Sequence, residues 1–242
     1  MVKSLGQDKF IIEALELLTD YPRLGLISKD NRTVLGGDFE LYDESNTFLD
    51  SYKVEICPTD AYPYQFPLVY EIGKKLPINI DWHVCPDGHL CIKTIPEEQI
   101  TCARGITLKY FLEEELKPYL FNQVHRRTFG YYKSERSHGM RGVLEFYEGF
   151  FKTRDLLEIV SLLTFIATGN EPGRSSECFC NRDVLYRKCH RDQYRKMKLL
   201  GREAIFTLLS DLIHSPLFFS RHPLEAMKLR QQINNNPVKT LL

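Results

Sequence analysis

The apolar residues of this chain change their spacing near residue 24, and that change constrains the fold more than any other feature. Over residues 8–20 they recur every three or four positions, which predicts a helix. Over residues 52–57 apolar and polar residues alternate, which predicts a half-buried antiparallel strand. Four strands are expected, at 24–27, 39–42, 52–57 and 68–72, separated by turn sequences at 30–31, 36–37 and 43–46. A helix followed by a four-strand antiparallel meander is therefore the first prediction.

Helical spacing returns after residues 74–105, a segment in which no clear period is visible. Helices are expected from Thr107, then around 143–151 and 155–167, with a last one over 192–213. Strands grouped first and helices grouped afterwards predict an α+β fold. The chain has 242 residues, 43% of them hydrophobic, which suits one domain with a sizeable core and an appended module.

Composition shifts predict three parts. Residues 1–152 form the α+β domain, and residues 153–230 form a helical extension that begins before the polar linker 169–176. Residues 231–242 are expected to be a flexible tail.

The charge balance and the apolar runs bear on the partners and the location expected for the protein. Lys plus Arg and Asp plus Glu are both 32, so the zero net charge favours neither nucleic acid nor an anionic membrane as a partner. The start of the chain has no apolar leader, and the most apolar run, 156–167, is shorter than the span of about 20 residues that a bilayer requires. A cytoplasmic protein without a membrane partner is expected. Its seven cysteines, odd in number and clustered, favour ligands or nucleophiles over disulfides.

The segment CFCNRDVLYRKCH, residues 178–190, has four metal-ligand residues, which are Cys178, Cys180, Cys189 and His190. Three thiolates and one imidazole suit tetrahedral Zn²⁺, and a complete protein shell predicts a structural rather than a catalytic ion. The spacing resembles the SEC-C motif, the zinc motif at the C-terminus of the bacterial protein-export motor. The glycines that usually follow the second cysteine are replaced by residues 181–183. The alternative is a set of unliganded thiols beside a surface histidine.

Basic residues are frequent in and after this segment. They are Arg182, Arg187, Lys188, Arg191, Arg195, Lys196 and Lys198. Such a face can contact nucleic acid or an acidic protein surface, but a solvated helix face is the favoured interpretation.

A second cysteine-containing segment, DWHVCPDGHLC (81–91), lies in the region without clear period, and long irregular segments in compact domains are usually functional. It carries His83, Cys85, His89 and Cys91 around a Pro-Asp-Gly turn. These four residues can be considered as one metal site, but they alternate across a short turn without a matching pair of ligands nearby. Taken alone, Cys91 reads as a small buried hydrophobe in a hairpin.

The order of these elements resembles the ubiquitin-conjugating enzymes over roughly residues 8–150. The likeness rests on a helix, a four-strand meander, the segment AYPYQFPLVYEI (61–72) and the sequence His…Gly-x-Leu-Cys. HVCPDGHLC is most similar to the bacterial branch of that family, as is ERSHGMRGVLEFY (135–147). The resemblance implies that Cys91 is the acceptor thiol and that His83 opens the active-site loop.

The implied function is that of a transferase. Cys91 would carry a ubiquitin-like modifier as a thioester and pass it to a lysine amine, which requires an accessible and partly ionised thiol. The implied partners are an activating enzyme, the modifier and a protein target, in the setting of bacterial antiviral defence. Glu97 and Glu98 are candidates to help deprotonate the attacking lysine.

The loop departs from the eukaryotic members at one position. They carry His-Pro-Asn, whereas Val84-Cys85 follows His83 here, so the asparagine is absent. A backbone N–H near Cys91, the side chain of His83 or that of His89 remain candidates to stabilise the oxyanion.

The roles of two further residues are left open by the sequence. Cys102 is expected to pack in the core, with a second thiol beside the site as the alternative. His138 is expected either near the active-site face or at the start of a helix.

Two other functions remain open. One is a non-catalytic adaptor of the same fold with a structural Cys91, which the missing asparagine favours and the retained cysteine opposes. The other is a zinc-containing protein that binds nucleic acid or the ribosome through residues 182–198, which the neutral net charge opposes.

Overall fold

The structure is a computed structural model that describes residues 5–30, 32–134, 137–180 and 182–235. The described residues divide into two compact units. The first takes in Met1–Thr94 and Thr101–His138, and the second takes in Ile95–Ile100 and Gly139–Leu242. The sequence boundary at 152 had assigned residues 139–152 to the first domain, whereas their packing places them in the second unit.

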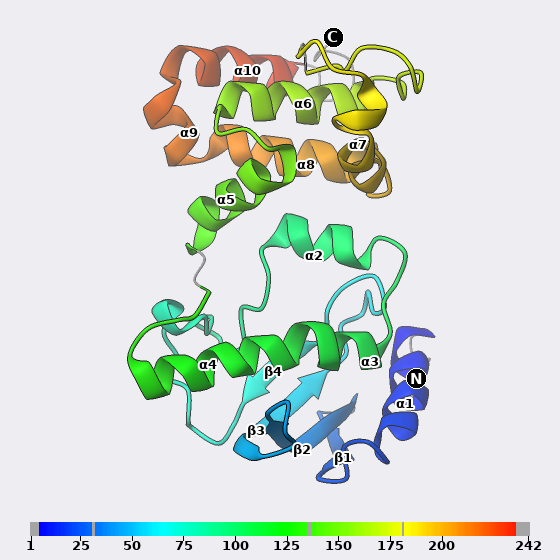
Figure 1. Cartoon of the computed structure of the whole chain (residues 1–242), viewed down its shortest axis with the longest axis vertical. Helices are drawn as coiled ribbons and strands as arrows, with labels where there is room; N and C mark the ends of the chain where they lie inside the picture. The colour runs from blue at the N-terminus through cyan, green and yellow to red at the C-terminus, as the bar shows by residue number, and fades with distance from the viewer. Residues whose placement is uncertain (1–4, 31, 135–136, 181, 236–242) are drawn as a thin grey trace. The chain divides into compact units, whose positions relative to one another are not determined.

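The first unit is an α+β fold with a four-stranded antiparallel sheet (Figure 1). Helix α1 (Leu5–Leu17) precedes strands β1 (Leu24–Lys29), β2 (Arg32–Tyr42), β3 (Phe48–Cys57) and β4 (Leu68–Glu71). Each strand pairs with the next one along the chain, in the order β1-β2-β3-β4. The predicted helix and meander are therefore confirmed.

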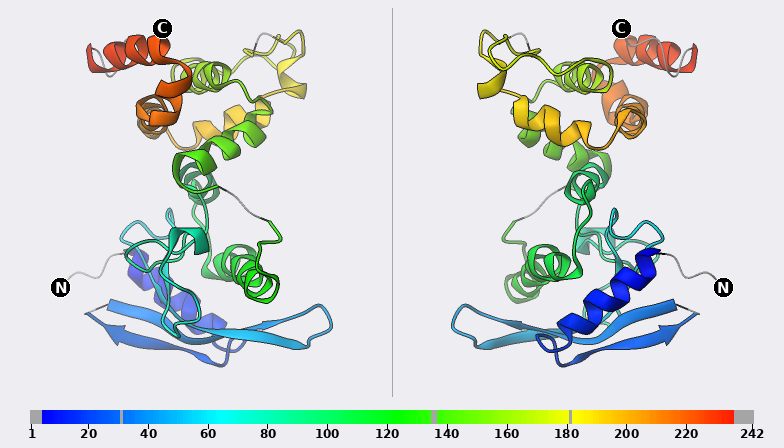
Figure 2. Two further views of the ribbon diagram at one scale, coloured as in Figure 1. Left: turned by 90° about the vertical axis from the view of Figure 1, so that its left-hand side faces the viewer. Right: turned by 90° about the vertical axis from the view of Figure 1, so that its right-hand side faces the viewer.

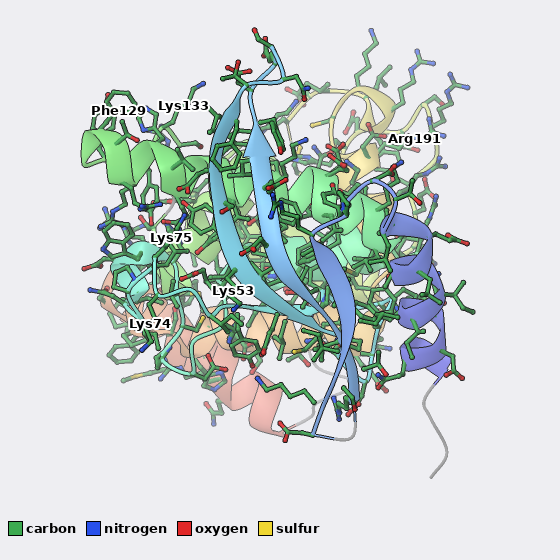
Figure 3. All side chains as sticks on the ribbon, turned by 90° about the horizontal axis from the view of Figure 1, so that it is seen from below. Lys53, Lys74, Lys75, Phe129, Lys133 and Arg191 are labelled. Atoms are coloured by element: carbon green, nitrogen blue, oxygen red, sulfur yellow. The ribbon has the colours of Figure 1, made fainter. Side chains whose placement is uncertain are left out.

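One face of the sheet builds the core of this unit. Tyr52, Val54 and Ile56 on β3 are fully buried, as the alternating pattern predicted. They pack with Phe10 of α1, and Figure 2 shows α1 on the same face of the sheet as helix α4 (Lys117–Phe129). Figure 3 views the opposite face, where exposed Lys53 extends from β3.

The expected turn at residues 36–37 is wrong, because both glycines lie inside β2. Gly37 has φ +139°, and a Cβ at this position would lie 2.1 Å from the carbonyl oxygen of Arg23. Glycine is therefore needed here for a close backbone approach rather than for a reversal of the chain.

The segment that showed no period contains helix α2 (Ile95–Cys102), which the sequence analysis missed. Thr107 begins the next helix as expected, since its side chain accepts a hydrogen bond from the backbone N–H of Tyr110. That helix runs through α3 (Leu108–Tyr110) and the π-helical segment η2 (Phe111–Leu116) into α4.

Asp50 ties α4 and the chain beyond β4 to the sheet. Its carboxylate accepts hydrogen bonds from Lys75 Nζ at 2.6 Å, from Arg127 Nη1 at 2.5 Å and from the backbone N–H of Ser51 at 2.8 Å. Burial alone would raise the pKa of Asp50, but these bonds hold it below its usual value.

Replacement of Asp50 by asparagine should destabilise the first unit by about 1–2 kcal/mol at neutral pH, because charge-assisted bonds are lost. The depressed pKa means that the unfolded chain binds the proton more tightly, so this contribution is present above the unfolded pKa near 3.8 and is lost as the pH falls through the lower folded value. Urea unfolding followed by the fluorescence of Trp82, the only tryptophan, measures it. Equal unfolding midpoints of the two proteins at pH 7 would contradict this role.

The second unit is helical. It contains α5 (Gly139–Phe151), α6 (Leu156–Thr168), α7 (Arg191–Lys198), α8 (Arg202–His214), α9 (Pro216–Arg221) and α10 (Pro223–Asn235). The last helix predicted over 192–213 is wrong as one element, because Gly201 at φ +82° separates α7 from α8. The expected tail from residue 231 is helical up to Asn235, and residues 236–242 lie outside the described range. No helix of the described ranges is both long and apolar enough to cross a membrane.

Candidate active-site loop and metal-ligand cluster

Residues 83–91 form a small hairpin at the end of β4. The backbone N–H of Cys91 donates to the carbonyl of His83, and that of Cys85 donates to the carbonyl of His89, both at 2.8 Å. The N–H of Leu90 donates to Val69 on β4 at 2.8 Å, which attaches the hairpin to the edge of the sheet. The loop is therefore an extension of the sheet rather than a free segment.

The turn of this hairpin is the predicted Pro86-Asp87-Gly88 sequence. The N–H of Gly88 donates to the carbonyl of Cys85 at 2.8 Å, and Gly88 has φ +92°. This is the pattern of a three-residue hairpin loop with a glycine bulge, in which proline sets the first position and glycine supplies the positive φ.

The alternation of the hairpin presents Cys91. Val84 and Leu90 pair with each other, are 3% and 4% exposed, and belong to the core. Cys91 follows Leu90 and is half-exposed, and Ile92 again packs against the core. Leu90 and Ile92 therefore anchor the loop to the core on either side of Cys91.

The same alternation assigns the four metal-ligand residues of the loop to one side of the hairpin, because their positions are all odd-numbered. Cys85 and Cys91 make a side-chain hydrogen bond to each other. Burial and this neighbouring thiol raise the pKa of Cys85 to about 12. Cys85 therefore stays protonated at neutral pH and can donate its S–H to the sulfur of Cys91.

Side chains on one face of α4 donate hydrogen bonds to the backbone carbonyls at the start of the loop. Tyr119 Oη donates to the carbonyl of His83 at 2.9 Å, and Gln123 Nε2 donates to that of Trp82 at 2.9 Å. Arg126 donates to the carbonyl of Asp81 and lies over the ring of Trp82, 4.2 Å from its centroid.

The roles of these three residues were not predicted from the sequence. Gln123, only 1% exposed, follows buried Leu116 and Leu120 at helical spacing, and an amide at such a position is the signal by which they could have been found.

His83 lies between two other rings. Its ring centroid is 4.2 Å from that of His138 and 5.2 Å from that of Tyr132. Burial first, and then His138 and Arg126, lower the pKa of His83 to about 4, so its imidazole is neutral at neutral pH. Of the two alternatives for His138, its ring contact with His83 fits a position beside the loop, whereas no cap on α5 is seen, since its buried Nδ1 has no hydrogen-bond partner among the described residues.

Most of the backbone N–H groups near Cys91, which were candidates to stabilise the oxyanion, already donate hydrogen bonds within the protein. The N–H groups of Cys85, Gly88, Leu90 and Cys91 all donate within the hairpin or to β4. Among the side chains named from the sequence, the neutral imidazole of His83 retains an N–H that can donate. His89 Nδ1 is 2.6 Å from the carboxylate oxygen Oδ1 of Asp87 and donates to it, so in the neutral imidazole the other ring nitrogen of His89 can only accept.

The remaining named residues of this region are described within their own units. Cys102 is fully buried in the core of the first unit, in agreement with a packing role. Glu97 is buried and Glu98 is half-buried, in the part of α2 that belongs to the second unit.

In the second unit, Cys178, Cys180, Cys189 and His190 form the predicted cluster, with their ligand atoms all within 4.8 Å of one another. Cys180 Sγ is 3.6 Å from Cys189 Sγ, and His190 Nδ1 is 3.4 Å from Cys178 Sγ and 3.3 Å from Cys189 Sγ. Tetrahedral Zn²⁺ separates two sulfur ligands by about 3.8 Å and sulfur from nitrogen by about 3.5 Å. The cluster can therefore hold one tetrahedral metal ion after small adjustments.

His190 is oriented for this role by a second contact. It is 2% exposed, and its Nε2 lies 2.9 Å from the carbonyl oxygen of Phe151. A carbonyl only accepts, so Nε2 carries the proton and Nδ1 turns its lone pair toward the three sulfurs. Burial lowers the pKa of His190, which favours the neutral form that binds metals.

A short hairpin and stacked aromatic rings support the cluster. The N–H of Cys178 donates to Val184 at 2.9 Å, and Glu177 pairs with Leu185. The ring of Phe179 stacks on Phe165 of α6 at 4.4 Å between centroids. Residue 181, at the point where the SEC-C likeness departs, lies outside the described residues, as do residues 135 and 136 of the other motif.

The basic face is partly used within the second unit. Arg182 pairs with Glu158 at 2.6 Å, Arg195 pairs with Glu171 at 2.7 Å, and Lys198 Nζ donates to backbone carbonyls. These contacts engage three of the seven basic side chains, and the solvated face stays a prediction.

No family model, no curated protein and no solved structure matches this chain.

Proposed function

We propose that the first unit is a ubiquitin-conjugating-like transferase that carries a ubiquitin-like modifier as a thioester on Cys91. The observation that supports this most directly is the presentation of Cys91, which is half-exposed next to core residue Leu90 on a hairpin bonded to β4. A carboxyl group on another protein can reach such a thiol without unfolding the loop. The proposed partners are an activating enzyme, the modifier and a protein target.

The reaction would proceed by two acyl transfers. The sulfur of Cys91 attacks the thioester carbonyl of the charged activating enzyme, forms a new S–C bond and releases the thiolate of that enzyme. A lysine amine of the target then attacks the Cys91 thioester, forms an isopeptide bond, loses a proton and frees the Cys91 thiol. Neutral His83 is the proposed side-chain donor to the oxyanion in each step.

In the second unit we propose Zn²⁺ as the ion of the Cys178, Cys180, Cys189 and His190 cluster. Three sulfurs and one imidazole at these spacings suit zinc, and four protein ligands leave no coordination position for a substrate. The ion would therefore hold the 177–185 hairpin to the helices and take no part in the acyl transfers.

The transferase proposal is tested by incubating the purified protein with ATP and a panel of bacterial activating enzymes, each with its own ubiquitin-like modifier. We expect one of these pairs to produce an adduct that is visible on a non-reducing gel and is cleaved by a thiol reductant. If none does, while each activating enzyme forms its own thioester, the non-catalytic adaptor becomes the favoured function.

A further inference from the structure

The turn of the active-site hairpin gathers a second set of metal ligands. Cys85, Asp87 and His89 place one ligand atom each within 4.8 Å of the others. All three can be reached by ions from solvent, since Cys85 is half-exposed and the side chains of Asp87 and His89 are 59% and 30% exposed. This group differs from the four-residue set considered from the sequence, because it contains Asp87 and does not need His83.

The backbone already holds these residues in place. The hydrogen bonds from Cys85 to His89 and from Gly88 to Cys85 close the loop, so little conformational entropy remains to be lost when a ligand binds. His89 Nδ1 and Asp87 Oδ1 lie 2.6 Å apart and share one proton. Tetrahedral Zn²⁺ holds a nitrogen and an oxygen ligand about 3.3 Å apart, so a cation can replace that proton if the two atoms separate by about 0.7 Å.

The donor types indicate which cations fit. One thiolate, one imidazole and one carboxylate suit Zn²⁺ and ions of similar softness, whereas Mg²⁺ and Ca²⁺ prefer oxygen ligands only. Three protein ligands leave the fourth tetrahedral position open. The thiol hydrogen-bonded to Cys85 is that of Cys91, which is not part of the group whose ligand atoms all lie within 4.8 Å of one another, so Cys91 has to turn toward the ion to fill the open position.

We propose that Cys85, Asp87 and His89 bind a divalent cation of the Zn²⁺ class and that Cys91 supplies its fourth ligand. Binding releases the protons of the two thiols and engages the half-exposed sulfur of Cys91. The site is more exposed than the Cys178–His190 cluster, so the ion is expected to be held more weakly and to exchange. The inference concerns the protein alone and does not depend on whether Cys91 forms a thioester.

The test uses the full chain with its Cys178–His190 cluster already loaded with one equivalent of zinc, under a non-thiol reductant. Cobalt(II) is then titrated and the thiolate-to-cobalt absorption is recorded. In parallel, the rate at which iodoacetamide alkylates Cys91 is followed by mass spectrometry of the peptide that contains it. We expect about one further equivalent of cobalt and at least a tenfold slower alkylation of Cys91 at saturation.

Matched variants assign the ligands. Cys85→Ser and His89→Ala should lose the second equivalent and the protection of Cys91, whereas Cys57→Ser and His125→Ala, at half-exposed positions of the same unit, should keep both. Circular dichroism checks that each variant is folded. The proposal is overturned if folded His89→Ala still binds the second cobalt, or if saturated wild-type protein is alkylated at Cys91 as fast as the metal-free loop.

Discussion

Replacement of Cys91 by alanine should abolish the thiol-sensitive adduct completely, and Cys91→Ser should convert it into an adduct that resists thiol reductants. The alanine variant has no nucleophile, whereas serine forms an oxyester, which amines and thiols attack far more slowly. The gel assay with the activating enzyme that charges the wild-type protein measures both outcomes. The side chain of Cys91 is only half-buried, so neither substitution should unfold the loop.

The neighbouring thiol provides the sharpest control. Cys85→Ser keeps the size of the side chain and its hydrogen-bonding capacity next to Cys91, and the pKa of about 12 of Cys85 makes it a poor nucleophile at neutral pH. We expect this variant to form the same thiol-sensitive adduct as wild type. If the adduct persists in Cys91→Ala and disappears in Cys85→Ser, Cys85 is the acceptor and the assignment of Cys91 is wrong.

Loss of one ligand from the Cys178–His190 cluster is the second change with a large expected effect. His190→Ala should release about one zinc per chain and destabilise the second unit by more than about 3 kcal/mol, because the binding free energy of a structural zinc is largely folding free energy. Replacement of His190 also leaves the carbonyl of Phe151 without its buried donor. Metal analysis after gel filtration and thermal unfolding by circular dichroism measure the two effects.

The two-unit architecture supplies the internal control for this experiment. Trp82 lies in the first unit, so its fluorescence should report an unchanged urea midpoint in His190→Ala. Cys102→Ala, a core substitution in the first unit, should show the opposite pattern, with full zinc content and an earlier tryptophan transition. An unchanged zinc content per chain in both His190→Ala and Cys178→Ser would show that the proposed ligand set is wrong.

Short-range patterns predicted much of the fold correctly. The alternation at Tyr52, Val54 and Ile56 located β3 and its buried face, and Thr107 marked a helix start through its capping side chain. The prediction failed where a local signal had a long-range cause. In the sequence, Gly37 has the appearance of a turn residue. In the structure, glycine is required at position 37 because a side chain there would clash with the backbone of Arg23, which is distant in sequence.

The candidate sites likewise contain some features that local sequence predicts and others that depend on distant residues. A cluster was predictable from the spacing of four residues, Cys178, Cys180, Cys189 and His190. They lie within one short segment, so a single reversal of that segment is enough to bring their ligand atoms together. The carbonyl of Phe151 that orients His190 comes from a different helix and was not predictable from that spacing.

For the loop, the sequence by itself determined the turn at Pro86-Asp87-Gly88 and the neighbours of Cys91, since proline and glycine restrict the backbone locally. Only the tertiary structure decided which groups surround that turn. It places Tyr119, Gln123 and Arg126 on the carbonyls of residues 81–83 and pairs the N–H of Leu90 with the carbonyl of Val69 on β4. The physical reason is that hydrogen bonds and ligand clusters depend on distances between atoms, and residues far apart in sequence acquire those distances only when the sheet and α4 pack together.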